Sequence, residues 1–430
     1  MRIAHFGTFD VENYGDLLFP LVLERRLAHL GAEIVHVSPV GGAAVLPDAR
    51  PSLASKEAFE SQFDAVMVGG GNILHARETS LPAYGKSPER ARLAYAELWL
   101  GASALAARLE VPLVWNAPGV PAAFGPATAP FVAWAAASCD RLAVRDSGSA
   151  HRLRSAGYAG PIAIVPDTAI EVAALWPAEQ RRAAFRDAFA ARKVDAIPER
   201  TVFIHLNSRY ATGEAGEIAE RVARIARRFD ALPILAALGG CHGDGELARR
   251  VGGTLPGPVL VLDELRSLCE AAACIEASVA YVGSSLHGLI TACAFGRPAI
   301  LVARESSRGS AKFSGFIAQW TRARCGGTQP GLHWVSSWEE VEGRIGDDGG
   351  LVAPARVDRD AVESLLFGTP PRDRLETHWR AVEEAIVRPR SECRARRSGS
   401  RRVLDFLRAR GPVGQPLFDA VLSDQARARR

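Results

Sequence analysis

The chain has 430 residues, of which 48% are hydrophobic, and a formal net charge of +4. This length is enough for two ordinary domains with full cores, and a mean hydropathy of +0.01 is typical of a globular protein. The sequence has no run of about 18 apolar residues, and residues 1–6 lack the hydrophobic region and cleavage site of a signal peptide. We therefore expect a cytoplasmic protein that does not span a membrane.

The positive charge is concentrated at the C-terminal end. Residues 387–430 contain twelve arginines and four acidic residues, a net charge of +8, which leaves −4 for residues 1–386. The main part of the chain therefore lacks the basic character of a nucleic-acid-binding surface. We expect residues 387–430 to form a solvated basic tail. The alternative is a weak contact with anionic lipid at the inner face of the membrane, where each basic residue contributes about 1 kcal/mol.

The seven cysteines are scattered and odd in number, which is typical of reduced, buried thiols. Cys241, His242 and Asp244 share a glycine-containing loop, but they offer few ligands and no zinc-type spacing. We therefore predict no metal site.

Short apolar runs alternate with helical patterns in residues 1–175, which predicts a parallel sheet covered by helices on both faces. The expected helices include residues 17–30 and 97–109. The expected strands are residues 2–6, 34–38, 65–68, 112–116, 142–144 and 162–165.

Polar loops follow several of these strands. The loop after the first strand contains Asn13, Gly15 and Asp16, and it lacks the G-x-G-x-x-G pattern of a dinucleotide-binding site. Asp16 is either a ligand-binding residue or the cap of the following helix. Asp167, after the last strand of this half, could accept a hydrogen bond from a sugar hydroxyl, although Pro-Asp is also an ordinary turn.

Three consecutive glycines and Asn72 follow the third strand. Residues such as Gly70 and Gly71 can turn several backbone amides toward one anion. They can equally allow a strand and a helix to pack closely. The position after a buried strand favours the anion site.

The alternation starts again in residues 176–386, after a helical connector over residues 173–200. We expect strands at 201–206, 232–238 and 259–262, a helix at 217–229, and a helix capped by Asp263 that runs to Cys274. Arg209 follows the first of these strands, and Arg304 and Lys312 lie in a basic loop near residue 310. A helical pattern at 358–387 closes this second domain.

The most informative stretch is residues 279–302. An apolar strand, a Gly-Ser-Ser turn, a helix from His287 to Phe295 and a second apolar strand follow one another. Ser284 or Ser285 is suited to cap this helix, which places His287 at its positive end, where anions bind. Gly288 lets a ligand or a neighbouring backbone approach closely. A lone histidine is more often structural, but the strand, turn, histidine and glycine together favour a site.

These residues resemble the signature of the polysaccharide pyruvyl transferases. That family usually reads Ser-Arg-Leu-His-Gly where this chain has residues 284–288, followed by a small-residue helix that ends in Gly-x-Pro, here residues 296–298. The Asn-x-Gly-Asp element at 13–16, Arg145-Asp146, Pro166-Asp167 and Lys312 also resemble family elements. The resemblance covers residues 2–334 and implies two Rossmann-like domains that face a cleft, the glycosyltransferase-B-like α/β architecture.

The resemblance also implies an activity: transfer of a pyruvyl group from phosphoenolpyruvate to two hydroxyls of a sugar in a cell-surface glycan or its precursor. The products are a cyclic ketal and phosphate, and no cofactor beyond the phosphoenolpyruvate donor is expected. His287 is the expected general acid, and Asp16 or Asp167 is expected to orient or deprotonate the acceptor. The expected substrate-binding residues are Asn13, Gly15, Asp16, Gly70, Gly71, Asn72, Asp167, Arg209, Ser284, Ser285, Leu286, Gly288, Arg304 and Lys312.

Ser285 departs from the family pattern, because the family has an arginine there that is expected to hold the donor. Either another cation, Arg209 or Arg304, replaces it, or the donor is different. One alternative function is a glycosyltransferase or epimerase of the same architecture that uses a nucleotide sugar. Another is a catalytically inactive relative that binds a glycan.

Overall fold

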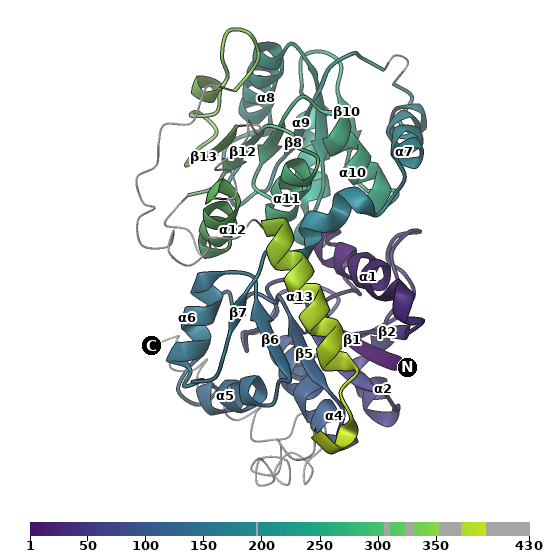
Figure 1. The fold of residues 1–430 in the computed structure, drawn as a ribbon. Helices are drawn as coiled ribbons and strands as arrows, with labels where there is room; N and C mark the ends of the chain where they lie inside the picture. The colour runs from purple at the N-terminus through teal and green to yellow at the C-terminus, as the bar shows by residue number, and fades with distance from the viewer. Residues whose placement is uncertain (195–196, 305–309, 323–330, 352–370, 393–430) are drawn as a thin grey trace.

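The computed structural model describes residues 1–194, 197–304, 310–322, 331–351 and 371–392. Within these residues, two parallel sheets form the two halves of the molecule (Figure 1). The basic tail predicted from the sequence lies outside the described residues from position 393 onward, and so do residues 352–370 of the expected closing helix.

The first sheet has the strand order β3-β2-β1-β4-β5-β6-β7 in the described part of the chain. Its strands are β1 (Arg2–Phe6), β2 (Glu33–Ser38), β3 (Leu53–Ala54), β4 (Ala65–Gly69), β5 (Leu113–Asn116), β6 (Arg141–Val144) and β7 (Ala163–Ile164). The helices of this half are α1 (Tyr14–Leu27), η1 (Ala28–Leu30), α2 (Ser55–Glu60), α3 (Pro88–Ala96), the π-helical turn η2 (Glu97–Gly101), α4 (Ala102–Leu109), α5 (Ala129–Ala137), α6 (Ser147–Ser155) and η3 (Thr168–Ala174). The central strands are apolar and fully buried because helices cover both faces of the sheet.

The second sheet has the order β10-β9-β8-β11-β12-β13 within the described residues. Its strands are β8 (Thr201–His205), β9 (Leu232–Ala236), β10 (Leu260–Leu262), β11 (Tyr281–Gly283), β12 (Ala299–Val302) and β13 (Leu332–Val335). The helices of this half are α7 (Ala178–Ala191), α8 (Ala215–Phe229), η4 (Gly240–His242), α9 (Asp244–Gly252), α10 (Leu268–Ala277), α11 (Leu286–Ala294), α12 (Ser310–Arg322) and η5 (Glu342–Arg344). The predicted fold class, two Rossmann-like α/β halves of the glycosyltransferase-B-like type, is therefore confirmed.

The N-cap predicted for α10, the helix that precedes residues 279–302, was wrong. Asp263 does not cap α10; its carboxylate pairs with Arg249 at 2.8 Å. Helix α10 starts four residues later than a cap at Asp263 requires, and the Ser267 hydroxyl accepts from the amide of Glu270 at 3.0 Å. Serine and aspartate are almost equally good caps, so local sequence did not distinguish the two positions.

One hydrophobic core joins the two halves. Side chains of α1, such as Tyr14 and Leu17, share this core with Leu286 and Leu289 of α11. The Tyr14 amide donates to the carbonyl of Leu238 at 2.9 Å, and its hydroxyl lies 3.0 Å from the Thr291 hydroxyl. Shared apolar burial and buried hydrogen bonds therefore hold the sheets in a defined relation.

Helix α13 (Pro371–Ile386) packs on the first sheet and not, as the sequence suggested, on the second domain (Figure 1). Its buried face, which includes Leu375, Trp379 and Val382, joins the core of the first half. The His378 imidazole lies 2.7 Å from the side-chain oxygen of Asn116 at the end of β5. The amphipathic pattern predicts a buried face for α13, but it does not specify which sheet that face covers.

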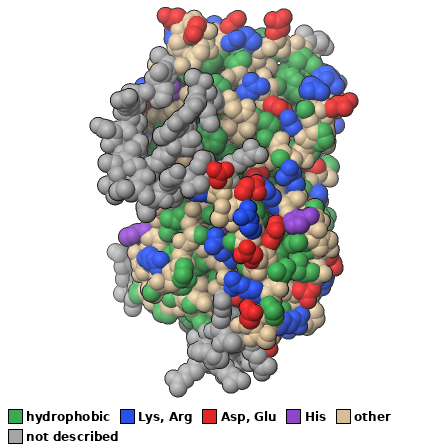
Figure 2. All heavy atoms as spheres, in the orientation of Figure 1, with side chains coloured by type: hydrophobic (Ala, Val, Ile, Leu, Met, Phe, Trp, Pro, Cys, Tyr) green, Lys and Arg blue, Asp and Glu red, His purple; other side chains and the backbone are tan. Residues whose placement is uncertain are grey.

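Ion pairs cover the outer side of this contact. Arg26 of α1 pairs with Glu171 of η3 and with Glu376 of α13, the latter at 2.8 Å. Figure 2 shows basic and acidic side chains side by side on this face of the molecule. Helix α13 is therefore fixed to the first half by an apolar face, a buried histidine and a surface ion-pair network.

Candidate active site

A pocket of about 230 Å³ lies between the two sheets. It is lined by residues of both halves, and most of them follow the carboxyl ends of strands. The lining residues are Thr8, Asn13, Asp16, Asn72, Ile73, Tyr95, Arg145, His205, Asn207, Arg209, Tyr210, Leu238, Gly239, His242, Asp244, Ser284, Ser285, Leu286, His287 and Lys312.

The sheet topology explains this location. Strand β1 has β2 on one side and β4 on the other, and β8 likewise lies between β9 and β11. At such a point the chain crosses over in opposite directions, which opens a crevice beyond the carboxyl ends of the strands. The two crevices contribute to one pocket, because Thr8 and Asn72 follow β1 and β4, while Asn207 and Ser284 follow β8 and β11.

The turn before α11 places His287 in the first turn of that helix. Ser285 is the N-cap, and its hydroxyl accepts from the amide of Gly288 at 3.3 Å. The buried Tyr281 hydroxyl supports the turn, since it contacts both the amide and the carbonyl oxygen of Ser285, at 3.2 and 3.1 Å. The serine that replaces the family arginine therefore has a structural role at the start of α11.

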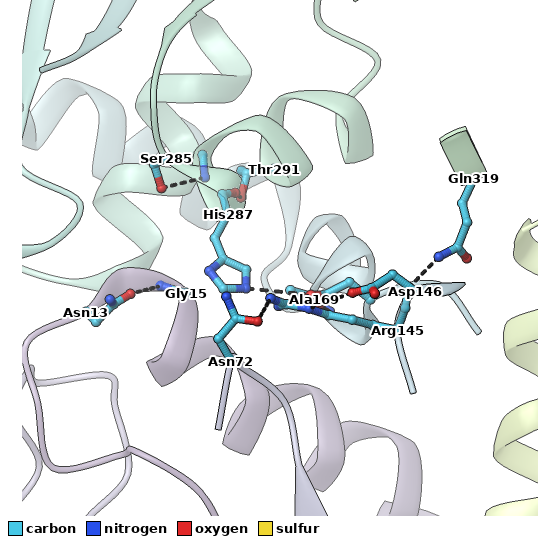
Figure 3. Close-up of polar contacts among 12 residues, drawn as sticks. Asn13, Gly15, Asn72, Arg145, Asp146, Ala169, Ser285, His287, Thr291 and Gln319 are labelled. Atoms are coloured by element: carbon cyan, nitrogen blue, oxygen red, sulfur yellow. Dashed lines mark hydrogen bonds and ion pairs between the residues drawn. The ribbon is translucent and has the colours of Figure 1, made fainter. Parts of the chain in front are cut away.

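The His287 side chain points from α11 toward the first half, where Asn72 and Arg145 lie (Figure 3). Its side chain is only 12% exposed. A Cβ atom on Gly15 would lie 1.7 Å from the ring nitrogen Nδ1, so the ring occupies the space that this glycine leaves free. Phe19 meets the ring edge-on at 5.5 Å between centroids. Packing from α1 therefore sets the orientation of the imidazole.

Asp167 connects His287 to an arginine. Its Oδ2 atom lies 3.8 Å from Nε2 of His287 and 2.8 Å from Nη1 of Arg145. Arg145 also donates to the side-chain oxygen of Asn72 at 2.6 Å. Burial opposes ionisation of Asp167, but His287 and Arg145 outweigh it and lower the pKa of Asp167 to about 2. The ionised carboxylate of Asp167 therefore faces the imidazole of His287.

Two buried nitrogen atoms at this network have no hydrogen-bond partner among the described residues. They are Nε2 of His287 and Nε of Arg145. Buried donors are nearly always paired in folded proteins, so a ligand in the adjoining pocket is a natural partner for them. Both residues line that pocket.

Lys312 of α12 and Arg209 bring positive charge to the opposite wall. Burial, together with the charges of Arg145 and Arg209, lowers the pKa of Lys312 to about 8. The positive charges of Arg145 and Arg209 therefore act on Lys312, and Asp16 only partly offsets this effect. Such an arrangement favours a bound anion with more than one negative charge.

Among the residues expected at the site, the structure brings nine together in the pocket lining and places six elsewhere. Gly15 and Asp167 lie behind the lining, in contact with His287. The exposed Arg304 is not part of the lining, nor are Gly70, Gly71 and Gly288. The residues in the lining are Asn13, Asp16, Asn72, Arg209, Ser284, Ser285, Leu286, His287 and Lys312.

The glycines that were expected to bind an anion allow close packing instead. Gly70 and Gly71 both have positive φ angles, of 72° and 67°. A Cβ atom on Gly70 would lie 2.1 Å from the ring of Phe19, and one on Gly71 would lie 2.9 Å from a carboxylate oxygen of Asp16. Gly288 likewise makes room for Leu238, at 2.7 Å.

Asp16 is not the cap of α1, which was the structural alternative for this residue. Asn13 is the N-cap, with its side-chain oxygen 3.2 Å from the amide of Gly15. Asp16 instead presents its carboxyl to the pocket from the first turn of the helix. Burial raises the pKa of Asp16, while His287, Thr8 and Arg145 oppose this shift.

Sequence reasoning noted Arg145 only as part of a family element and did not assign it to the site. It also missed His205, Asn207 and Asp244. Arg145 follows β6 directly, and His205 ends β8. Their positions at the carboxyl ends of buried strands were the signal that could have identified them.

The family comparison agrees with the predicted family. The model of the polysaccharide pyruvyl transferase family matches residues 13–306 of this chain. The chain belongs to the polysaccharide pyruvyl transferase family. Membership indicates a transferase that acts on a polysaccharide, and the matched region contains every lining residue except Thr8 and Lys312. No curated protein matches the sequence.

Several solved structures resemble this pyruvyl transferase family member at low identity. UDP-GlcNAc 2-epimerase from Methanocaldococcus jannaschii is 12% identical with a TM-score of 0.47, over 79% of this chain and 90% of that chain. UDP-GlcNAc 2-epimerase from Neisseria meningitidis, bound to UDP-GlcNAc, is 13% identical with a TM-score of 0.45, over 81% and 96%. The E. coli ADP-heptose LPS heptosyltransferase II is 12% identical with a TM-score of 0.38, over 89% and 99%.

Within the described residues, none of the helices is both long enough and apolar enough to cross a bilayer.

Proposed function

We propose that this protein transfers a pyruvyl group from phosphoenolpyruvate to two hydroxyls of a glycan acceptor, forming a cyclic ketal and releasing phosphate. One observation carries the proposal. The His287 imidazole, at the start of α11, enters a pocket that Arg145, Arg209 and Lys312 also line. That combination supplies a proton donor next to a site for a small, multiply charged anion.

The donor needs cations for both its phosphate and its carboxylate. Arg145 has a buried Nε atom without a hydrogen-bond partner among the described residues, and its guanidinium is held in place by Asp167 and Asn72. Together with Arg209 and Lys312, this arginine compensates for the family arginine that is Ser285 here. The positive end of α11 adds the amides of its first turn. These features support a charged donor and argue against an inactive relative.

The methylene carbon of phosphoenolpyruvate must gain a proton before C2 becomes electrophilic. We assign this step to His287, because its ring lines the pocket and the Asp167 carboxylate lies 3.8 Å from Nε2. Asp167 itself is committed to Arg145, with a pKa lowered to about 2, and is therefore a poor base. Asp16 lies in the pocket lining and is suited to accept a hydrogen bond from an acceptor hydroxyl.

The test is to incubate the protein with phosphoenolpyruvate and a panel of glycan acceptors, and to measure phosphate release and product mass. The product is expected to be heavier than the glycan acceptor by the mass of pyruvate minus one water. Parallel reactions contain a nucleotide sugar in place of phosphoenolpyruvate. Consumption of the nucleotide sugar, with phosphoenolpyruvate left intact, would overturn the proposal.

Gly15→Ala is expected to lower the rate of phosphate release by about 100-fold, since displacement of a catalytic group by about 1 Å has effects of that size. The added Cβ would lie 1.7 Å from Nδ1 of His287 and must displace the ring. The variant should remain folded because alanine is the better helix former in α1. Gly216→Ala in α8, where a Cβ meets nothing within 4 Å, is the matched control. Equal rates for the two variants would contradict the assigned ring position.

The affinity for phosphoenolpyruvate is expected to fall as the pH rises above 8. The free protein loses the Lys312 proton near pH 8, whereas a bound anion favours the charged amine, so binding above that pH takes up a proton. Because binding takes up one proton, the affinity for phosphoenolpyruvate is predicted to fall about tenfold per pH unit above pH 8. Calorimetric titrations between pH 7 and 9.5 measure this slope. Lys312→Arg, which stays charged, should flatten the slope, and an unchanged slope in that variant would exclude Lys312 as its source.

A further inference from the structure

A second histidine lies in the pocket, in a polar chain that the proposed reaction has not yet used. Nε2 of His205 lies 2.9 Å from Oδ2 of Asp244. Nδ1 of the same ring lies 3.5 Å from the hydroxyl of Ser284. All three side chains are buried, with exposed fractions of 2 to 5%, and all three residues line the pocket.

The fold sets this arrangement from three elements. His205 ends β8 and pairs with Gly283 at the end of β11, so Ser284 follows directly beside it. A Cβ on Gly283 would lie 2.7 Å from Cβ of His205, so this glycine allows the close approach. Asp244 starts α9, and its other carboxylate oxygen accepts from the side-chain amide of Asn207 at 2.8 Å.

These contacts determine where the ring carries its proton. The Asp244 carboxylate only accepts hydrogen bonds, so Nε2 of His205 is the protonated nitrogen. Nδ1 is then the nitrogen left to accept, and the Ser284 hydroxyl is the group positioned to donate to it. When a carboxylate, a histidine and a serine are linked in this order, the serine oxygen can accept a proton while its own proton passes to the histidine. A distance of 3.5 Å is typical of such a contact before a substrate is bound.

The ketal reaction requires such a route, because two hydroxyls must each lose a proton. One of these two protons returns to His287 after it has protonated the methylene carbon. The other leaves bound to the phosphate. Asp167 is held by Arg145 and His287, and the carboxyl of Asp16 lies near the same two side chains. The imidazole of His205, on the other half of the molecule, has Nδ1 facing the Ser284 hydroxyl and the Asp244 carboxylate at Nε2.

We propose that Asp244, His205 and Ser284 form the proton acceptor for the first acceptor hydroxyl, a role that rests on the proposed pyruvyl transfer. The hydroxyl oxygen forms its bond to C2 and passes its proton to the Ser284 oxygen, while the Ser284 proton moves to Nδ1 of His205. The bond between C2 and the phosphate oxygen then breaks, and His205 returns the proton to the departing phosphate. The second hydroxyl attacks C2 and gives its proton to His287. Ser284 touches the substrate, and His205 and Asp244 act through it.

A purely structural chain would have the same distances, so the test must change the proton position and leave the hydrogen bonds intact. Asp244→Asn does this. The amide oxygen can still accept from Asn207, while the amide nitrogen donates to Nε2 of His205 and moves the ring proton to Nδ1. We expect kcat for phosphate release to fall by about 100-fold or more, with KM for phosphoenolpyruvate within about twofold. Asp263→Asn, the same chemical change at a surface ion pair, is the control and should keep the wild-type kcat.

Nitrogen-15 spectra of the histidines provide a readout that does not depend on turnover. The wild-type protein should show His205 protonated at Nε2, with the Nδ1 signal shifted by Ser284→Ala, and Asp244→Asn should show the proton at Nδ1. If the wild-type protein shows these signals but does not turn over phosphoenolpyruvate, the proposed function is refuted. The hydrogen-bonded chain of Asp244, His205 and Ser284 would still be supported. An active protein in which Asp244→Asn keeps the wild-type kcat, or in which the ring proton does not move, would overturn the relay.

Discussion

Replacing His287 with alanine is expected to reduce phosphate release from phosphoenolpyruvate by a factor of about 10² to 10⁴, the usual contribution of a general acid. The ring is the proton donor assigned to the methylene carbon, and Asp167 faces it at 3.8 Å. Alanine leaves the pocket cations in place, so donor binding should change far less than turnover. The measurement is continuous phosphate release at saturating donor, with KM taken from the same traces.

The control for this variant is His151→Ala, at an exposed position on α6. Thermal unfolding of both variants tests whether the fold is kept, since His287 also packs against Phe19. Turnover by His287→Ala within about threefold of the wild type would falsify the acid role.

Replacing Arg145 with methionine is expected to have two separable effects. The first is a loss of stability of about 3–5 kcal/mol, because the buried Asp167 carboxylate loses its strongest partner. The second is loss of donor binding, because Arg145 is one of the basic residues that line the pocket. A single variant that unfolds would not distinguish these effects.

The double variant Arg145→Met/Asp167→Asn separates them. Without the buried charge on Asp167, most of the lost stability should return, as measured by the free energy of unfolding in urea. Donor affinity should remain weakened by about tenfold or more, because a charge-assisted hydrogen bond contributes about 1.5–3 kcal/mol. Wild-type donor affinity in a stable double variant would show that Arg145 is structural only.

Strand periodicity and loop position predicted much of this molecule. Apolar runs such as residues 65–68 could only be buried strands, and they appear as β4 and its neighbours. His287 and Lys312 were predicted at the pocket from the loop-after-strand pattern and the family signature, and both line it. Ser284 and Ser285 were the two predicted N-caps of α11, and Ser285 is the N-cap in the structure.

The remaining features depend on contacts between distant residues, and local sequence does not encode these. The glycines at the end of β4 were expected to form an anion site, with close packing as the alternative, and the packing became visible only from the position of Phe19 against Gly70. The helical pattern of α13 predicts one buried face, but the sheet that it covers depends on Asn116 and the core around β1 and β5. Arg145 and His205 follow strands of different halves, so their shared pocket becomes visible only when both sheets are placed.

The most direct test of the account is the reaction carried out in deuterium oxide with an acceptor glycan and phosphoenolpyruvate. Protonation of the methylene carbon by an exchangeable group of the protein predicts a ketal whose methyl group carries one deuterium, with one phosphate released per ketal. Phosphate release and deuterium incorporation should disappear together in His287→Ala. A ketal methyl group without deuterium, or phosphoenolpyruvate left unconsumed with every acceptor, would contradict the proposed chemistry of this pocket.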